Sequence, residues 1–395
     1  MTKNEVMLED IKLKGIAWDH PRGYEPLRET SRIFSDKNPR VSIEWHIRSL
    51  KEFGDMPIED LIESYDLITI DHPYMGQAHK NRLLLSLESY LPNHFLKDME
   101  RQSLGPSYTS YRFGGHLYAL PIDAAALVAA HRADLMKDLK LKPPTARNQL
   151  FDFYKKVPKE YQVAWALCPT DLWCAFLTLC AQDGGVDFIQ EGGVDAQIGA
   201  TVLDELKAHL EYLHPKSLDW NPIQILDRMG TNDDLVYAPY LFGYTNYSRN
   251  NFRNHLITFG NSPTNPKHEI STILGGVGLA VSAKTEFPEW ASAYAKYVSS
   301  AETQKGVYTI NAGQPSNLEA WQDKANNKLC HNFFSNTMTT MQNAYVRPQY
   351  PGWNSFQEQG AELLHQALIG DIPSLNAMRD LNEMYKSIVS HGEYV

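Results

Sequence analysis

The sequence predicts an α/β fold in which parallel strands are joined by crossover helices. Up to Ile70, three strand-like segments alternate with two helix-like segments. That order favours a parallel sheet, because parallel neighbours need a crossover connection and this connection is usually helical. The chain has 395 residues, of which 43% are hydrophobic, so it can bury a large core in two or three domains.

The early elements follow the residue patterns closely. The helix begins near Tyr24, places Leu27 and Phe34 near one face, and ends at Asn38–Pro39. The strand after it alternates apolar and polar residues, as expected when only one face is buried. The expected elements are, in order, a strand over 13–18, a helix over 24–37, a strand over 41–47, a short helix over 58–65 and a strand over 67–70.

The tripeptide Asp-His-Pro occurs twice, each time just after one of these strands. The first copy is Asp19–Pro21 and the second is Asp71–Pro73. Proline ends a strand because it has no N–H for the ladder. In open α/β sheets, ligands bind outside the carboxyl ends of the strands. The two copies therefore predict two sides of one site, although Asp-Pro-type turns are also common after strands without any ligand.

A glycine turn and a proline-containing strand come next. Gly114–Gly115 predicts a turn into a strand that Pro121 interrupts, and Ala124–Ala130 continues as a run of small residues. This segment is a candidate crossing between two domains. The later helices are expected over 147–156, 171–181, 202–213, 222–229, 288–300, 353–368 and 375–388, with one more from 333 onward.

The segment 235–247 contains five aromatic residues in eleven positions, with Gly and Pro among them. We interpret it as the end of a strand followed by an aromatic loop. Asn246 and Arg249 bring hydrogen-bonding groups to the same place, which favours a binding loop over an ordinary aromatic core patch.

The segment Ile273–Ser282 predicts a glycine-rich turn inside a pair of strands. It is not a phosphate-binding loop, because no Gly-Lys-Ser/Thr follows, and its spacing does not fit a dinucleotide fingerprint. The remaining reason for so many glycines is close approach of the backbone to a ligand or to another domain.

Composition excludes several classes of protein. The net charge is −10 and no basic block is present, which argues against a nucleic-acid or anionic-membrane partner. The apolar runs are shorter than the roughly 20 residues of a membrane span. The four cysteines lack zinc-site spacing, and Cys174 and Cys180 are expected to be free thiols in a buried helix. The first ten residues contain no secretory signal.

The order and spacing of these segments resemble those of the family 1 solute-binding proteins of ABC importers, which mostly serve sugars and related small organic molecules. The resemblance covers nearly the whole chain. It is carried by Gly114–Asp123, Leu274–Ser282, the helix that runs into Gln304, Gly313–Pro315, Arg347–Tyr350 and Leu368–Gly370.

The resemblance implies a two-lobed, periplasmic-binding-protein-like fold of type II, with a mainly parallel sheet flanked by helices in each lobe. The lobes would close on a ligand like a hinge. Residues 1–121 and 275–320 would form lobe one, and residues 122–274 and 321–395 would form lobe two with the C-terminal helices.

In such a cleft, aromatic faces and polar groups hold the ligand. Arg22 and Arg249 could pair with a ligand carboxylate or phosphate, so a sugar-like ligand and an organic acid both remain open. The candidate ligand-binding residues are Trp18, Asp19, His20, Arg22, Asp71, His72, Tyr74, Asp123, Tyr237, Tyr240, Tyr244, Asn246, Arg249, Gly275, Gly276 and Trp353, and Tyr118 is a further candidate for stacking.

The resemblance implies that the protein is the substrate-binding component of an ABC importer, outside the cytoplasmic membrane. It implies a small-molecule ligand, permease subunits as possible partners, a monomer, and neither a cofactor nor a metal. Two departures keep an alternative open. The given chain carries neither signal peptide nor lipoprotein cysteine, and the Asp-His-Pro pair is not a general feature of sugar binders. The alternative is a cytoplasmic enzyme or ligand sensor, in which the Asp-His pairs act as acid and base or as metal ligands.

Overall fold

The computed structural model describes residues 10–265, 267–370 and 372–389. Lobe one begins with parallel strands, since β1 pairs in register with β2 on one side and with β3 on the other. The strands and helices expected up to Ile70 are present in the expected order, and the short helix α2 is present in addition. The elements are β1 (Ile11–Trp18), α1 (Pro21–Lys37), β2 (Val41–Arg48), α2 (Leu50–Asp55), α3 (Ile58–Ile62) and β3 (Leu67–Ile70).

Short helices and a hairpin complete this part of lobe one. The hairpin between β4 and β5 turns at Gly114 and Gly115, whose φ angles of 54° and 79° suit glycine. The turn expected there is confirmed. The elements are η1 (His72–Tyr74), α4 (Met75–Asn81), η2 (Leu87–Ser89), α5 (Asn93–Arg101), η3 (Gly105–Ser107), η4 (Thr109–Tyr111), β4 (Arg112–Phe113) and β5 (His116–Leu117).

Strand β6 (Ala119–His131) crosses from one lobe to the other. Its first half pairs with β12, and its second half pairs with β10 and β11. The expected crossing is therefore confirmed, but the expected interruption at Pro121 is wrong. Pro121 lies opposite Gly278 at an irregularity in the β6–β12 register, where the missing N–H of proline is tolerated.

Strand β12 (Leu274–Val281) also crosses between the lobes. The turn expected within Ile273–Ser282 is wrong, because these residues form one continuous strand between β3 and β6. Its glycines make room for neighbours. A Cβ on Gly275 would lie 2.5 Å from the Phe242 ring, and a Cβ on Gly276 would lie 2.4 Å from the carbonyl oxygen of Asp123.

Lobe two contains the middle of the chain. Helix α8 is buried along most of its length and carries the free thiols Cys174 and Cys180, as expected. The elements are α6 (Ala133–Asp138), η5 (Arg147–Gln149), α7 (Leu150–Tyr154), β7 (Gln162–Val163), α8 (Pro169–Gly184), η6 (Gly185–Phe188), β8 (Ile189–Gln190), β9 (Gly193–Val194), α9 (Ala196–His209), η7 (Leu210–Tyr212), η8 (Pro215–Leu218), α10 (Pro222–Thr231), β10 (Leu235–Phe242), η9 (Thr245–Ser248) and β11 (Thr258–Gly260).

The remaining helices divide between the lobes. Helix α11 packs on β12 and on α1, whereas α16 packs on α8 and α17 packs on α9. The elements are α11 (Pro288–Ser299), α12 (Ala301–Thr303), η10 (Gln304–Tyr308), α13 (Leu318–Gln322), α14 (Lys324–Leu329), α15 (Phe333–Gln342), α16 (Trp353–Ile369) and α17 (Ser374–Ile388).

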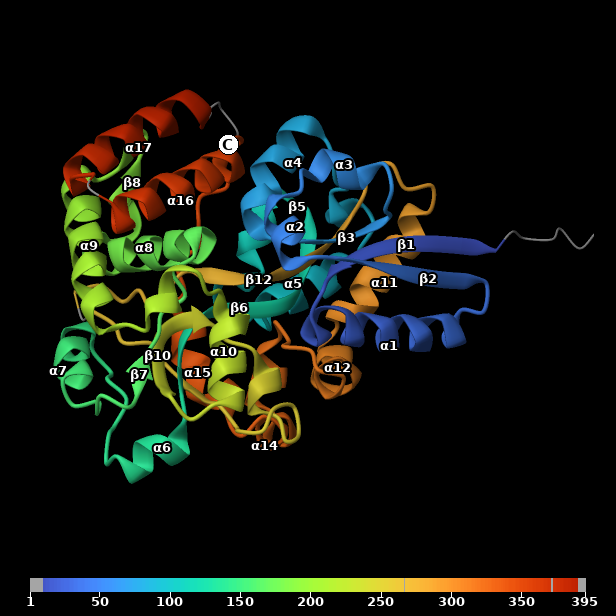
Figure 1. Ribbon diagram of the computed structural model, residues 1–395. Helices are drawn as coiled ribbons and strands as arrows, with labels where there is room; N and C mark the ends of the chain where they lie inside the picture. The colour runs from blue at the N-terminus through green and yellow to red at the C-terminus, as the bar shows by residue number, and fades with distance from the viewer. Residues whose placement is uncertain (1–9, 266, 371, 390–395) are drawn as a thin grey trace, which may run out of the picture.

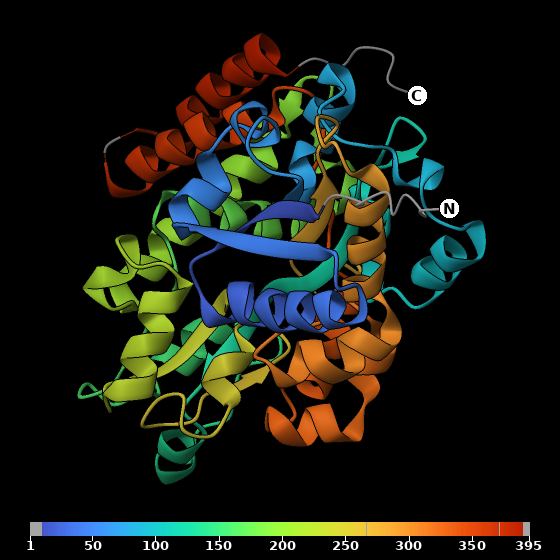
Figure 2. The same ribbon diagram turned by 90° about the vertical axis from the view of Figure 1, so that its right-hand side faces the viewer.

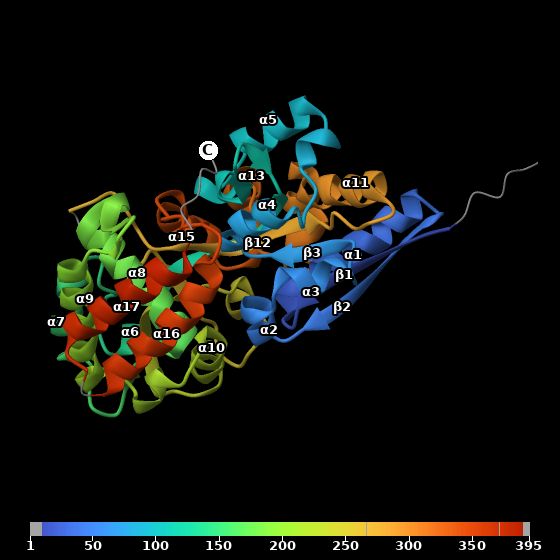
Figure 3. The ribbon, with the colours of Figure 1, turned by 90° about the horizontal axis from the view of Figure 1, so that it is seen from above.

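The α/β class and the two-lobed form are confirmed. Figure 1 shows β1, β2, β3 and α1 in one lobe, α8, α9, α16 and α17 in the other, and β6 and β12 running between them. Figure 2 looks onto lobe one, where α1 lies along one face of the sheet. In Figure 3 the C-terminal helices lie over α8 and α9. The sheet order is β2-β1-β3-β12-β6-β10-β7.

Strand direction in lobe two differs from the mainly parallel sheet that we expected. Strands β10 and β11 both run antiparallel to β6, and only β7 runs parallel to β10. The reason is that β6 enters lobe two as a crossing strand. Strands β10 and β11 follow it in the chain and run back along it in the opposite direction. The boundaries of the two lobes at residues 121, 274 and 320 stay a prediction.

Candidate functional site

The second Asp-His-Pro begins η1 at the carboxyl end of β3. The Asp71 carboxylate accepts a hydrogen bond from the backbone N–H of His72 at 2.8 Å. It also forms an ion pair with Arg347, whose Nη2 lies 2.5 Å from Oδ2. Burial acts to raise the pKa of Asp71, but the charge of Arg347 outweighs it and holds this pKa well below its usual value. Asp71 is therefore a carboxylate at neutral pH.

His72 is fully buried beside this ion pair. Burial and the positive charge of Arg347 lower the pKa of His72, so its ring is neutral at neutral pH. The ring lies edge-on to Tyr111, and its Nδ1 is 3.1 Å from the Asp71 carboxylate. Tyr74, at the end of η1, is also buried, with 8% exposure.

The first Asp-His-Pro begins α1 at the carboxyl end of β1. The His20 side chain caps the helix, because its Nδ1 accepts a hydrogen bond from the backbone N–H of Arg22 at 3.0 Å. Burial, with help from Arg22 and Arg253, lowers the pKa of His20 to about 3. Its ring packs against Tyr244 at 4.7 Å between centroids. Asp19 is exposed, and Trp18 is buried against Phe53.

Arg22 connects this motif to the crossing strand and to lobe two. Its guanidinium forms two hydrogen bonds with the Asp123 carboxylate, at 2.8 and 2.5 Å. A third N–H donates to the carbonyl oxygen of Gly243 at 2.8 Å. The same guanidinium lies over the Tyr244 ring, 4.7 Å from its centroid. Arg22 and Asp123 are both almost completely buried.

Of the aromatic segment 235–247, only the last residues reach the junction between the lobes where Arg22 lies. Tyr244 is in contact with Arg22, and Asn246 follows it on η9, which lies against α1. Thr245 Oγ1 and Asn246 Oδ1 are buried and have no hydrogen-bond partner among the described residues. These groups come from lobe two and stand beside the first Asp-His-Pro of lobe one.

Several predicted residues lie elsewhere. Tyr237 packs on Phe153 in the core of lobe two, and the Tyr240 hydroxyl donates to the carbonyl oxygen of Pro263 at 2.6 Å. Trp353 is buried against Trp173 and Phe356.

Other predicted groups serve contacts within the fold. Arg249 donates to the carbonyl oxygens of Thr309 and Ile310. Gly275 and Gly276 pack against Phe242 and β6, as described above. Tyr118 shares a hydrogen bond of 2.6 Å with His79.

Asp171 was missed by the sequence argument. It lies in the first turn of α8 with 9% exposure, and its Oδ2 accepts a hydrogen bond from the Cys168 thiol at 3.1 Å. Burial raises the pKa of Asp171 to about 7. The signal in the sequence was Pro169 followed by an acidic residue, which is typical of a helix start, in a helix that otherwise looks purely structural.

A cavity of about 410 Å³ opens between the lobes at this place. Lobe one contributes Tyr74 and Gln77, and lobe two contributes Thr170 from α8 and Asn354 from α16. Glu59 and Glu358 are the charged residues that line it, and the described lining includes no Lys, Arg or His. Tyr74 is therefore the sequence-predicted residue that lines the cavity itself, and the second Asp-His-Pro directly precedes it in the chain. The described lining includes no residue of the first Asp-His-Pro.

The Asp-His pairs do not form a metal centre or an evident acid–base pair. Within the described ranges, no group of three or more His, Cys, Asp or Glu side chains is placed to hold a metal ion. His20 caps a helix, and Asp71 is paired with Arg347. In the part of the chain that the structure describes, no helix combines the length and apolarity needed to cross a membrane.

Comparison with known proteins agrees with this geometry. A family model described as bacterial extracellular solute-binding protein matches residues 60–331, which is more than half of the chain.

Solved structures with bound maltose, ribitol or D-mannitol share the fold over almost the whole length. The maltose-bound MalE3 protein of T. maritima has a TM-score of 0.82 at 17% identity, over 96% of this chain and 100% of that chain. A solute-binding protein of Agrobacterium radiobacter K84 in complex with ribitol has a TM-score of 0.81 at 17% identity, over 96% and 99% of the two chains. One from Agrobacterium vitis S4 with bound D-mannitol has a TM-score of 0.77 at 15% identity, over 95% and 97%.

Proposed function

The chain belongs to the bacterial extracellular solute-binding protein family, and from that premise we propose that its lobe junction binds a small, uncharged, hydroxyl-rich solute. The protein would deliver this solute to the permease of an ABC importer, outside the cytoplasmic membrane. The observation that carries the choice of ligand is the described lining of the interlobe cavity, which contains neutral polar and aromatic side chains, Glu59 and Glu358, and no Lys, Arg or His.

The charges at the junction favour a neutral ligand over an organic acid. Two arginines of the junction are already matched by carboxylates, Arg22 by Asp123 and Arg347 by Asp71. The lowered pKa values keep His20 and His72 uncharged. An anion would meet Glu59 and Glu358 at the cavity, and the described lining contains no Lys, Arg or His to balance its charge. Burying an unbalanced charge is costly.

Hydroxyl groups suit the polar atoms that remain. Tyr74 and Tyr350 line the cavity, and aromatic side chains commonly pack on the C–H surface of a sugar or polyol. Thr170 and Asn354 offer neutral donors and acceptors on the lobe-two side of the cavity. Gln77, whose amide already donates to Glu59 at 2.8 Å, offers its carbonyl oxygen on the lobe-one side. A volume of about 410 Å³ falls within the ordinary range for small-molecule sites.

The enzyme or sensor alternative has less support. Its argument rested on two Asp-His pairs facing one cleft, but His20 is occupied as a helix cap and Asp71 as the partner of Arg347. Neither pair offers an acid and a base poised toward the same point of the cavity.

Isothermal titration calorimetry tests the ligand class. We expect at least one of maltose, ribitol and D-mannitol to bind, and D-gluconate, the acid analogue, to bind at least about tenfold more weakly, which corresponds to about 1.4 kcal/mol. Tighter binding of gluconate than of every neutral probe would contradict the proposal.

Two variants locate the site. Asn354→Ala and Gln77→Ala should each weaken binding about tenfold, since each removes one neutral hydrogen-bonding group from the cavity. Gln359→Ala is the matched control, because Gln359 is exposed on the same helix as Asn354 and does not line the cavity. Equal loss in the control and the test variants would place the site elsewhere.

A further inference from the structure

Strand β2 is an open edge of the large sheet. It comes first in the sheet order, and its 8 residues pair in register with β1 on one side. Among the described residues, no strand pairs with its other side. In Figure 2 this edge faces the viewer, with β2 in front and α1 below it. Natural sheets often protect such an edge with proline, lysine or a bulge, and β2 contains none of these.

The backbone of β2 presents hydrogen-bonding groups to this edge. At the two ends of the strand, the carbonyl oxygens of Arg40 and Arg48 accept hydrogen bonds from the β1 side, both at 2.8 Å. Backbone groups point to alternate sides along a strand, so the even-numbered residues face β1. The N–H and C=O groups of Ile43, Trp45 and Ile47 therefore point outward, where a further strand can pair with them.

These outward residues match a second copy of the same strand. If two copies of β2 pair antiparallel about a two-fold axis at Trp45, Ile43 of each copy faces Ile47 of the other. These are pairs of the hydrogen-bonded type, in which the two residues exchange both N–H···O bonds. Between them, Glu44 faces His46 of the other copy in the closer type of pair. A carboxylate thus meets an imidazole, and apolar side chains meet apolar side chains.

Other registers of the same pairing lose this match. An axis at Glu44 or at His46 would place two identical polar side chains opposite each other. An axis two residues away from Trp45 would place His46 opposite Arg40 or Arg48. Like charges in directly opposed positions are destabilising. The residues of β2 therefore favour the register centred on Trp45, and this self-complementarity is why the edge fits a second copy of the chain.

The side chains along this edge are already held in position. The Trp45 ring lies so close to Gly15 of β1 that a Cβ there would come within 2.5 Å of it. Its Nε1 donates to Ser31 Oγ of α1 at 2.7 Å. Ile47, two residues further on, is 39% exposed. Pairing with a second copy would cover this apolar side chain, and the ordered strand would lose little conformational freedom.

We propose that the protein forms a two-fold symmetric dimer through β2, with Trp45 on the axis. The lobe-one sheets of the two copies then become one continuous sheet. Strands β1 and β3 separate β2 from the crossing strands, so lobe two of each copy lies away from this interface. The inference differs from the monomer that the family resemblance implies. It goes beyond the proposed function and does not depend on which solute binds.

Sedimentation velocity of the full chain tests the dimer. Between about 1 and about 100 µM, we expect wild-type protein to pass from monomer to dimer. Ile47→Lys should stay monomeric over this range, because lysine on an edge strand opposes pairing. Ile310→Lys is the matched control, since Ile310 is also exposed but lies outside β2. The control should dimerise as wild type does.

An exchange of two side chains tests the register. His46→Glu places two carboxylates opposite each other on both sides of the axis and should weaken the dimer about tenfold. The double variant Glu44→His, His46→Glu restores a carboxylate opposite an imidazole, and its affinity should return to within about threefold of wild type. If His46 served only its contact with Tyr65, the second substitution would not restore the dimer.

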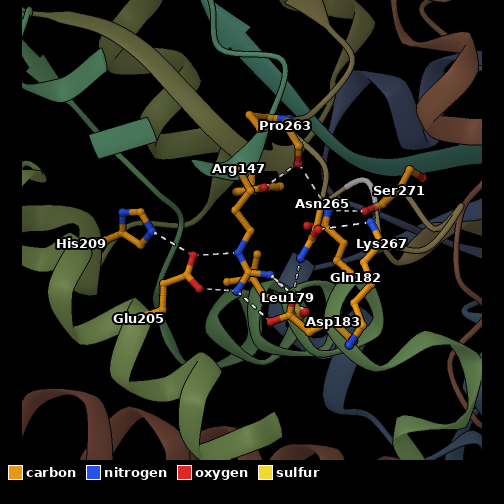
Figure 4. A network of polar contacts seen from close by, with 11 residues as sticks. Arg147, Leu179, Gln182, Asp183, Glu205, His209, Pro263, Asn265, Lys267 and Ser271 are labelled. Atoms are coloured by element: carbon orange, nitrogen blue, oxygen red, sulfur yellow. Dashed lines mark hydrogen bonds and ion pairs between the residues drawn. The ribbon is translucent and has the colours of Figure 1, made fainter. Parts of the chain in front are cut away.

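Arg147→Met separates dimerisation from stability. Arg147 donates to Asp183 at 2.9 Å and to Glu205 at 2.7 Å, and all three residues lie in lobe two (Figure 4). Loss of this buried network should lower the melting temperature measured by circular dichroism. The variant should still dimerise as wild type does, because none of these residues is near β2.

The exchange of Glu44 and His46 also decides the case in which Ile47→Lys does not fold, since both of its positions are exposed. The proposal is overturned if wild-type protein remains monomeric at about 100 µM. It is equally overturned if folded Ile47→Lys dimerises as wild type does, or if the double variant dimerises no better than His46→Glu.

Discussion

The Asp-His-Pro tripeptide has a different structural role in each of its two copies. In the first copy, the histidine is the cap of α1 and the aspartate is exposed. In the second copy, the aspartate caps η1 and pairs with Arg347, while the histidine is buried and neutral. Identical residues after two parallel strands thus acquire different roles because different segments of lobe two pack against them.

At the scale of single residues, Asp171 should make stability depend on pH. The pKa of Asp171 is about 7 in the folded protein, above the value of about 3.9 in an unfolded chain. Between these values the folded state keeps a proton that the unfolded state releases. The contribution of Asp171 to the free energy of unfolding therefore falls as pH rises through this window, by up to about 1.4 kcal/mol per pH unit, and is constant above it.

Urea unfolding of Asp171→Asn checks this expectation. The variant carries no titrating group at this position, so its stability relative to wild type should be greater at about pH 8 than at about pH 5. Asp36→Asn, at an exposed position of α1, serves as the control and should show no such difference. A difference of the opposite sign would mean that Asp171 is charged and stabilised in the folded state.

At the scale of elements, the glycines of β12 explain how two lobes share one strand. Gly276 has a φ of 106°, a conformation that other residues adopt only with strain. Gly275 and Gly278 leave space for the rings of Phe242 and Tyr111. These positions look like a turn in the sequence, because glycine is equally suited to a turn and to close packing between strands.

Gly276→Ala should therefore destabilise the protein by roughly 2–3 kcal/mol. The added methyl would combine the strain of the positive φ with a contact of 2.4 Å to the Asp123 carbonyl oxygen. Gly260→Ala is the control in β11, because a Cβ there meets nothing within 4 Å. Its stability should stay within about 0.5 kcal/mol of wild type in the same chemical denaturation. Equal effects at both positions would show that the close packing at Gly276 is not what matters.

At the scale of the whole molecule, the lobes are joined by structure that belongs to both. Strand β6 contributes Leu120 to the core of lobe one and Leu127 to a core of lobe two, and β12 pairs with β6 along most of its length. Residues 347–350 add a third connection, since the Gln349 amide donates to the carbonyl oxygens of His72 and Ser110. If one lobe unfolds, it exposes its half of β6 and β12. The other half of each strand still belongs to the lobe that remains folded.

Unfolding should accordingly occur in one cooperative transition. Far-ultraviolet circular dichroism and tryptophan fluorescence should change together with urea, and the calorimetric enthalpy should equal the van't Hoff enthalpy. Trp18 and Trp45 report on lobe one, and Trp165 and Trp173 report on lobe two. Two separate transitions would show that the shared strands do not couple the lobes.

Local elements were predictable because their signals are local. The strand over 67–70 is buried at all four positions. The helix expected over 24–37 ends before Asn38–Pro39 as predicted, although it begins three residues earlier, at Pro21. Two errors came from residues with two possible uses. Pro121 was expected to end a strand and instead lies at an irregularity of β6, and the glycines of β12 were expected to turn.

The site was predictable only in part. Both Asp-His-Pro motifs follow parallel strands, so the sequence placed them at one edge of the sheet. The structure confirms this placement. Which aromatic side chains reach that edge depends on the packing of lobe two, and for this reason Tyr244 contacts Arg22 while Tyr237 and Tyr240 lie in the core. Asp171 escaped notice because its importance comes from burial, which has no signature at a helix start.

The sequence by itself determined the α/β class and the order of the early elements, because hydrophobic periodicity and turn residues act over a few neighbouring residues. It also determined the family, because the order of the segments carries the resemblance. Only the tertiary structure decided that Asp71 meets Arg347 and that Arg22 meets Asp123. These pairs join residues 276 and 101 positions apart. Contacts at such separations depend on how whole lobes pack, and no local pattern of residues specifies them.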